Sequence, residues 1–294
     1  MLSPDLLRHL EQFQLLTQRA SKSGAKGERR SRARGHSVEF ADYRNYSPGD
    51  DFRYLDWNLY GRLEKFFLKL FEEERELPVS LFLDASESMG FGTPLKFTLA
   101  QQLTAAIAYV ALCGFDQVST YVFPEINCSP GQKHFFRSMR GRNAALPFLT
   151  MLQEIRPKGS FQFGAELRRA SFGKRKAGLA VVISDFLSPD GYEQGLRSLQ
   201  GRGFQVCAIQ ILSVQEIRPE LFGELKLIDA ETGAEQEVTF ARYRLAAYQK
   251  TVEQFCQKLQ QFCRARGMQF LSLRSDAPLE EALLKQLRKA QIWE

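Results

Sequence analysis

The sequence lacks the features that mark several large classes of protein. It contains no apolar run of the roughly 18 residues that a membrane-spanning helix needs. Its first residues include acids and show no small-residue cleavage site after an apolar core, so no secretory signal is predicted. No Cys-x-x-Cys pair occurs, and the odd number of cysteines, 5, argues against a disulfide framework. We therefore expect a cytoplasmic protein with reduced, buried thiols.

Motifs of common enzymes are also missing. The 3 histidines show no metal-ligand spacing, and none adjoins a nucleophile loop. The string nearest to a phosphate-binding loop, residues 159–164, lacks the lysine that holds the phosphates. Nucleotide hydrolysis of that type is thus excluded, and we expect a protein that is not an enzyme.

Positive charge is present but concentrated. The net charge is +6, and residues 22–35 alone hold six Lys or Arg against the single acid Glu28. Clustered basic residues can neutralise phosphates, but no aromatic residue stands among them to stack on bases. We predict a solvated or partner-contacting loop, and nucleic-acid binding through residues 22–35 remains an alternative.

Two apolar segments end in polar residues and organise the rest of the chain. Residues 79–83, Val-Ser-Leu-Phe-Leu, predict a buried parallel strand, and residues 178–184 predict a second one that closes on Asp185. The loop after the first strand carries a carboxylate and two hydroxyls, on Asp84, Ser86 and Ser88. Ligands bind at such carboxyl ends in open α/β sheets, and oxygen-only ligands suit Mg²⁺ or Mn²⁺. The alternative is that these residues only cap the following helix.

Strands and helices alternate from Pro78 onward, which predicts an α/β fold with a doubly wound, mostly parallel sheet flanked by helices. Residues 224–240 interrupt this alternation and predict a β-hairpin insertion. We expect residues 77–294 to form this main domain. Residues 1–76 are expected to supply an N-terminal helix, the basic loop and an arm packed on it.

Smaller features are predicted by capping residues and periodicity. Ser3 is expected to cap a helix whose apolar stripe runs from residue 3 to 20. Asn143 is expected to cap a helix that reaches Ile155, and residues 278–289 predict a closing helix.

The segment from Arg34 to Glu76 resembles a bacterial family known as domain of unknown function 58. The matching residues, in order, are Arg44, Tyr46, Gly49, Asp50, Asp51, Arg53, Asp56 and Trp57. The Asp-x-Ser-x-Ser string after a buried strand is similar to the metal-ion-dependent adhesion site of von Willebrand factor A domains. Both resemblances imply a von Willebrand factor A-like fold of Rossmann type.

The second resemblance also implies a metal site. Its expected ligands to Mg²⁺ or Mn²⁺ are Asp84, Ser86, Ser88, Asp185 and Ser160. Phe161 stands where the second loop of such sites has a threonine, and a phenyl ring cannot ligate a metal. Either Ser160, a lesser candidate, substitutes for that ligand, or the ligand is missing and the site is weak. Ser188 and Asp190 are weaker candidates, for which we prefer a role in capping the helix that starts near Asp190.

The family resemblance implies a function in protein interaction. Members often accompany MoxR-type AAA ATPases, so we expect an adaptor or chaperone-type partner that docks an acidic residue at the metal-ion-dependent adhesion-like site. In the matching block, an internal ion-pair lock and a partner-binding surface both remain open for Asp50, Asp51, Arg53, Asp56 and Trp57. The enzyme alternative is a magnesium-dependent phosphoester hydrolase with Asp84 as nucleophile, although Ser86 stands where a second acid is usual.

Overall fold

A computed structural model describes most of the chain, which divides into two compact units. One unit comprises residues 1–26 and 77–294, and the other comprises residues 27–76. The described residues are 2–15, 39–47, 51–72, 77–124, 135–171, 177–219, 223–228, 235–240 and 242–293. Within these ranges, no helix is both long and apolar enough to cross a membrane.

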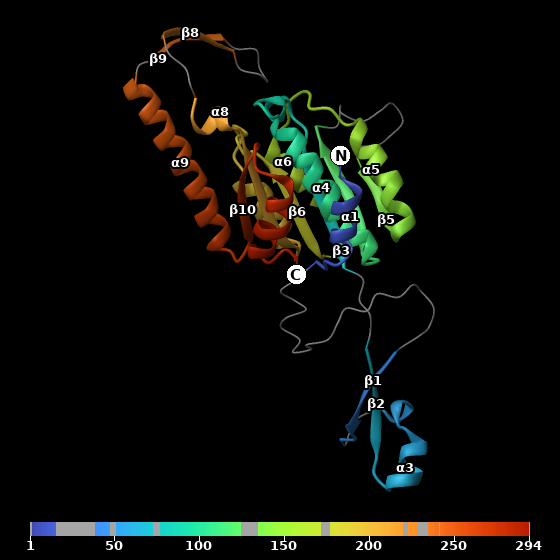
Figure 1. Ribbon diagram of the computed structural model, residues 1–294. Coiled ribbons are helices and arrows are strands. Elements are labelled where there is room, and N and C mark those ends of the chain that lie inside the picture. Colours follow the sequence, from blue (N-terminus) through green and yellow to red (C-terminus); the bar gives the residue numbers. More distant parts are fainter. Residues whose placement is uncertain are drawn as a thin grey trace. The chain divides into compact units, whose positions relative to one another are not determined.

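The larger unit is built on a six-stranded sheet in the order β10-β7-β6-β3-β4-β5 (Figure 1). Neighbouring strands are parallel except β4 and β5. Every residue of β6 is buried, as in other strands that are covered on both faces. The strands are β3 (Pro78–Asp84), β4 (Gln117–Phe123), β5 (Phe135–Arg140), β6 (Leu179–Ser184), β7 (Gln205–Leu212) and β10 (Gln269–Arg274).

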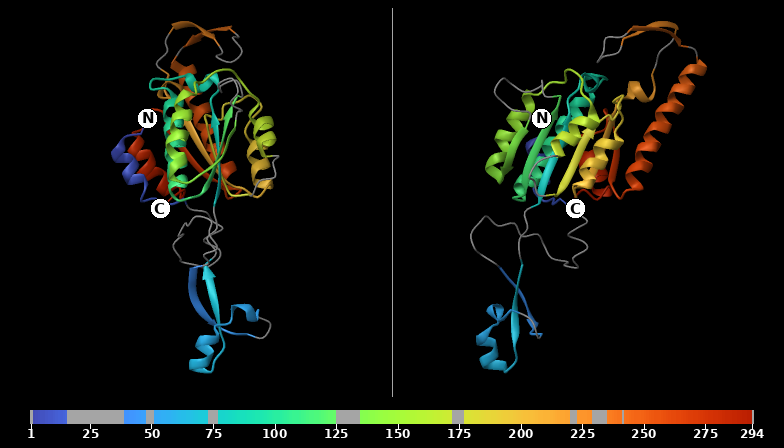
Figure 2. Two further views of the ribbon diagram at one scale, coloured as in Figure 1. Left: turned by 90° about the vertical axis from the view of Figure 1, so that its right-hand side faces the viewer. Right: turned by 180° about the vertical axis from the view of Figure 1, so that it is seen from behind.

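Helices cover both faces of this sheet (Figure 2). Side chains alternate along β3, so that Leu81 and Leu83 enter one buried cluster while Phe82 enters the other. The first cluster includes residues of α1 (Pro4–Leu10), α4 (Lys96–Cys113), α5 (Ala145–Glu154) and the π-helix Ala282–Leu287. The second includes residues of α6 (Phe163–Ser171), α7 (Glu193–Gly201) and α9 (Arg242–Arg264).

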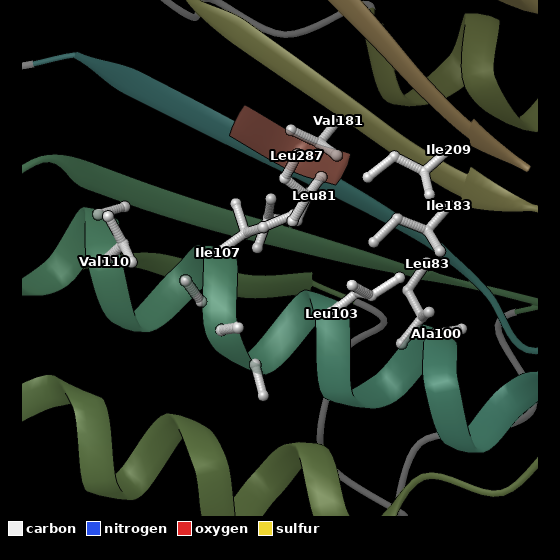
Figure 3. Close-up of a cluster of buried hydrophobic side chains, with 14 of the residues drawn as sticks. Leu81, Leu83, Ala100, Leu103, Ile107, Val110, Val181, Ile183, Ile209 and Leu287 are labelled. Atoms are coloured by element: carbon white, nitrogen blue, oxygen red, sulfur yellow. The ribbon is translucent and has the colours of Figure 1, made fainter. Parts of the chain in front are cut away.

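Helix α4 is the central helix of the first face. Ala100, Leu103, Ile107 and Val110 lie against the sheet residues of β3, β6 and β7 (Figure 3). Helices α1 and α5 contact α4 as well, so most of its side chains are buried. This explains why its sequence is apolar on nearly every side, with Lys96 as a charged exception at its first residue.

The remaining elements, apart from this sheet and the helices that cover it, are short. Strands β8 (Gly223–Ile228) and β9 (Glu235–Phe240) pair antiparallel, which confirms the pairing of the predicted hairpin; its predicted turn lies outside the described residues. Helices α8 (Val214–Ile217) and α10 (Leu279–Glu281) are single turns. Short 3-10 helices span Phe52–Tyr54, Glu87–Gly90 and Arg142–Ala144.

The described residues of the smaller unit form an antiparallel strand pair, the 3-10 helix Phe52–Tyr54 and helix α3 (Trp57–Leu63). Strands β1 (Glu39–Asn45) and β2 (Phe67–Glu72) are joined through a segment that contains α3. The side chain of Asp56 caps α3 by accepting hydrogen bonds from the amides of Asn58 and Leu59.

The structure confirms the fold class and corrects several details. Helix α1 ends at Leu10 instead of residue 20, although Ser3 caps it as predicted. It groups with the larger unit, because Leu6 and Leu10 are buried in that core. The predicted packing of the arm on the main domain stays a prediction. Asn143 does not cap α5, which begins at Ala145 without a side-chain cap. The closing helix is α10 followed by the π-helix.

Candidate functional site

The predicted polar residues meet where β3 and β6 end. Leu83 pairs with Ile183 in the parallel register, so Asp84 and Ser184 are the next residues on neighbouring strands. The Ser184 hydroxyl donates to Asp84 Oδ2 at 2.5 Å. Asp185 follows directly and is as buried as Asp84, with 2% and 5% of their surfaces exposed. The two predicted acids therefore lie at one rim of the sheet.

The loop after β3 folds around the Asp84 carboxylate. Asp84 Oδ1 accepts from the Ser86 amide at 2.9 Å and from the Ser86 hydroxyl at 2.6 Å. The hydroxyls of Ser86 and Ser88 lie 3.0 Å apart. Ser86 stands at the start of the 3-10 helix Glu87–Gly90 but makes no side-chain capping bond. The helix-capping alternative for Ser86 is therefore not what the structure shows.

The electrostatics of Asp84 follow from its position. Burial raises the pKa of Asp84 to about 7, and the neighbouring charge of Asp185 acts in the same direction. The hydrogen bonds from Ser184 and Ser86 act in the opposite direction and lower it. Asp84 is thus a carboxyl group that holds its proton far more tightly than an exposed aspartate.

A buried lysine that sequence reasoning missed holds Asp185. Lys96 Nζ lies 2.7 Å from Asp185 Oδ2 and 2.5 Å from Glu216 Oε1, and the lysine side chain is 0% exposed. Burial lowers the pKa of Lys96, but the two carboxylates outweigh it and hold that pKa above its usual 10.5. The other Asp185 oxygen accepts from the Leu187 amide at 3.0 Å.

Glu216 reaches Lys96 from the loop after β7. Ser213 and Glu216 form a capping box at the start of α8, in which Glu216 Oε2 accepts from the Ser213 amide at 2.7 Å. The same loop lies against Gly92, whose φ is +98° and whose added Cβ would come within 2.5 Å of the Ser213 Cβ. Two features of the sequence were available as signals for this ion pair. One is the Ser-x-x-Glu string of the capping box, and the other is a lone lysine at the start of an apolar helix.

The second loop, residues 158–164, contacts the first through its backbone. The Lys158 amide donates to the Ala85 carbonyl at 2.9 Å, and the Glu87 amide donates to the Gly159 carbonyl at 2.8 Å. Ser160 in this loop is exposed. The half-buried ring of Phe161 stacks on Phe123 with their centroids 5.7 Å apart. Phe161 thus serves aromatic packing.

Asp190 caps a helix, but a different one from the helix predicted. Its two carboxylate oxygens accept from the amides of Phe163 and Gly164, at 3.1 and 2.8 Å, at the start of α6. The Ser188 hydroxyl donates to Asp190 Oδ1. Helix α7 instead begins after Tyr192 with no side-chain cap.

The donors at this rim fit a divalent ion poorly as a set. Ser86, Ser88 and Asp84 supply oxygens of the right kind. Both oxygens of Asp185 already have partners, one of them an ammonium, and Phe161 offers no ligand atom. The expected Mg²⁺ or Mn²⁺ stays a prediction that the geometry does not favour.

Exposed apolar side chains stand on the loops that form this rim. Phe91 and Leu95 lie in the loop after β3, with 50% and 43% of their surfaces exposed, and Leu187 follows Asp185 with 45% exposed. Leu95 precedes Lys96 directly, and Lys96 binds the carboxylate of Asp185. We call Phe91, Leu95 and Leu187 the rim patch.

In the smaller unit, the family-block residues have separate roles. Arg53 forms a bidentate pair with Asp51, in which Nε donates to Oδ1 and Nη2 to Oδ2, and the two side chains are 83% and 41% exposed. Asp56 caps α3 and also accepts from the Tyr43 hydroxyl at 3.0 Å. Trp57 is 63% exposed. Asp50 lies outside the described residues, and the broader ion-pair lock stays a prediction.

Comparisons with known proteins find similar sequences in mycobacteria. An uncharacterized protein of Mycobacterium tuberculosis is 27% identical over 250 residues, which are 82% of this chain and 76% of that protein. An uncharacterized protein of Mycobacterium avium is 31% identical over 103 residues, 35% of this chain and 60% of that protein. Both relatives are bacterial.

Two solved structures show partial similarity. The conserved hypothetical protein BatB from Bacteroides thetaiotaomicron aligns with a TM-score of 0.43 and 14% identity, over 73% of this chain and 98% of that one. The manganese-loaded TRAP protein of Plasmodium vivax aligns with a TM-score of 0.32 and 14% identity, over 46% of this chain and 57% of that one.

The family comparison covers most of both the arm and the sheet. Residues 42–256 match the family described as "Protein of unknown function DUF58". This span includes the Arg53, Asp56 and Trp57 block as well as the rim with Asp84 and Asp185. The chain belongs to the DUF58 family.

Proposed function

We propose that this chain is a non-enzymatic protein-interaction module that docks a protein partner on the rim patch. The observation that carries the proposal is the position of Phe91, Leu95 and Leu187, three exposed apolar side chains on the loops that follow β3 and β6. Single exposed apolar residues are ordinary, whereas several of them on loops at the same edge of the sheet make a candidate interaction surface.

The buried polar groups at the same edge of the sheet support a positioning role. Asp84 accepts two hydrogen bonds from Ser86 in the loop after β3 and one from Ser184 at the end of β6, and Lys96 is paired with two carboxylates. These internal bonds hold the loops in one arrangement, which lowers the entropy that a partner must remove on binding. The alternative of a magnesium-dependent phosphoester hydrolase would require turnover that disappears in Asp84→Ala.

The partner we propose is a MoxR-type AAA ATPase or a client of one. Support comes from membership in the DUF58 family, whose resemblance implies such partners, together with the rim patch. The adaptor role is proposed for a cytoplasmic setting. Nucleic-acid binding through residues 22–35 is the other alternative, and those residues lie outside the described part of the chain.

We propose that the smaller unit also contacts the partner. Phe52 and Trp57 are 62% and 63% exposed. The Asp51–Arg53 pair lies on the 3-10 helix that contains Phe52. Exposed aromatic and arginine side chains are frequent among residues that dominate binding energy. We propose Asp50, Asp51, Arg53, Asp56 and Trp57 as the partner-contacting segment, with Asp56 acting through its cap on α3.

The test measures binding of the MoxR-type ATPase encoded in the same genome to the immobilised full chain. Leu187→Asp places a charge in the rim patch. The matched control is Leu146→Asp, because Leu146 is 73% exposed on α5, which follows Arg140 and therefore starts at the opposite end of the sheet. A central apolar contact contributes about 2 kcal/mol or more, so Leu187→Asp should weaken binding about 30-fold. Equal affinities for the two variants would contradict docking on the rim patch, and no binding of the wild type would exclude this partner.

A further inference from the structure

We propose that the Lys96 ammonium, rather than a divalent ion, supplies the positive charge at this rim, so that the site works without a metal. The proposal concerns how the rim is held together and is independent of which partner docks there. It runs against the Mg²⁺ or Mn²⁺ that the sequence resemblance implies.

The first observation is the burial and bonding of the ammonium. Lys96 Nζ contacts Asp185 at 2.7 Å and Glu216 at 2.5 Å, and the side-chain exposures are 0%, 3% and 15% for Lys96, Asp185 and Glu216. A buried charge is retained only when it is paired and hydrogen-bonded. Lys96 meets that condition through two carboxylates on separate segments, the loop after β6 and helix α8.

The second observation is which loops the ammonium joins. Lys96 lies at the start of α4, Asp185 follows β6, and Glu216 follows β7. Reciprocal hydrogen bonds of 3.3 Å between Thr93 and Gln215 reinforce the contact between the first and third of these loops. One ammonium thus joins the start of α4, the loop after β6 and helix α8, three segments at the carboxyl ends of parallel strands.

The third observation is what remains for a metal. Asp185 has one oxygen on Lys96 and the other on the Leu187 amide. A divalent ion would have to share this carboxylate with a buried ammonium a few ångströms away. A unit positive charge at that distance, in a medium with an effective dielectric constant of about 20, lowers the affinity for a divalent cation by several orders of magnitude.

The experiment titrates Mn²⁺ into the full chain and follows free Mn²⁺ by electron paramagnetic resonance. The proteins are the wild type, Lys96→Met, and the double variant Lys96→Met/Asp185→Asn. Methionine keeps most of the length of the lysine stem and removes the charge. We expect no saturable site in the wild type up to about 1 mM Mn²⁺, the weak end of protein sites for hard divalent cations. In Lys96→Met we expect a one-to-one site whose Kd is at least about 100-fold below that limit. This site should be lost again in the double variant.

One wild-type result decides the question even if Lys96→Met does not fold. A one-to-one Mn²⁺ site in the wild type that disappears in Ser86→Ala would overturn the proposal. Absence of such a site, with an unfolding temperature unchanged by a chelator, supports it. If the wild type binds Mn²⁺, docking on the rim patch is still judged separately by Leu187→Asp.

Discussion

Removing the charge of Lys96 is the perturbation whose consequence the structure specifies most fully. In Lys96→Met, the carboxylates of Asp185 and Glu216 lose an ammonium that lies 2.7 and 2.5 Å away. The methionine stem fills most of the same space, so the loss is electrostatic and not a cavity. The variant therefore isolates the value of the buried cation.

The magnitude follows from the burial of the partners. Asp185 is 3% exposed at its side chain, so water cannot replace the missing ammonium. Leaving a buried charge without its partner costs about 3–5 kcal/mol of the free energy of unfolding. Domains of ordinary stability, about 5–15 kcal/mol, stay folded after such a loss.

Urea unfolding followed by circular dichroism at pH 7 measures the effect. The midpoint should fall while the slope with denaturant stays constant. Lys258→Met removes the same charge from an exposed position on α9 and should change the free energy of unfolding by no more than about 0.5 kcal/mol. Lys96→Met/Asp185→Asn should be more stable than Lys96→Met, because one uncompensated buried charge is gone.

Two results would refute this reasoning. A Lys96→Met midpoint equal to that of Lys258→Met would mean that the ammonium does not stabilise the rim. A double variant less stable than Lys96→Met would mean that Asp185 is stabilised by groups other than Lys96.

Three further predictions concern the same unit. The pKa of Asp84 is about 7 when folded against an ordinary 3.8, so the folded state binds the proton more tightly and the free energy of unfolding should fall as pH rises from 4 to 8, by about 4 kcal/mol at most. Asp84→Asn should lose most of this dependence in urea unfolding at pH 5 and pH 8, and an unchanged dependence would contradict the assignment. Gly92→Ala should lower the urea midpoint by the equivalent of about 1–3 kcal/mol, since its φ is +98° and its Cβ would meet Ser213; a neutral effect would argue against this loop contact. Leu10→Ala should cost about 2–5 kcal/mol in thermal or urea unfolding of the larger unit, because Leu10 is 0% exposed in its core; a change near zero would detach α1 from that unit.

The architecture was readable from the sequence where one physical signal dominated. The two apolar runs predicted as strands, residues 79–83 and 178–184, coincide with β3 (Pro78–Asp84) and β6 (Leu179–Ser184). The carboxyl ends of parallel strands lie at one edge, so Asp84 and Asp185 were expected together. They are together.

What failed depended on contacts between distant segments. Helix α1 was predicted to continue to residue 20, but it ends at Leu10, and Leu15 then pairs with Trp293 near the other end of the chain. Periodicity cannot show such a change of direction. Asp190 looked like a cap for the helix that follows it, yet its carboxylate is used by α6, which precedes it in the sequence.

The candidate site was only half predictable for the same reason. Asp-x-Ser-x-Ser indicated a cation, and the hydrogen bonds among Asp84, Ser86 and Ser88 match that motif. The positive charge that faces Asp185 comes from Lys96, which is 89 residues away in the sequence. Lys96 also pairs with Glu216, a second carboxylate from a distant segment. A lysine at the start of an apolar helix carries no sequence signal for the loop that it will meet.

Hydrogen exchange of the full chain with and without the MoxR-type ATPase tests the docking surface most directly. We predict that amide exchange slows in residues 86–96 and 186–188, the loops that carry Phe91, Leu95 and Leu187. A bound ATPase that leaves both loops unprotected, while slowing exchange elsewhere in the chain, would contradict docking on the rim patch.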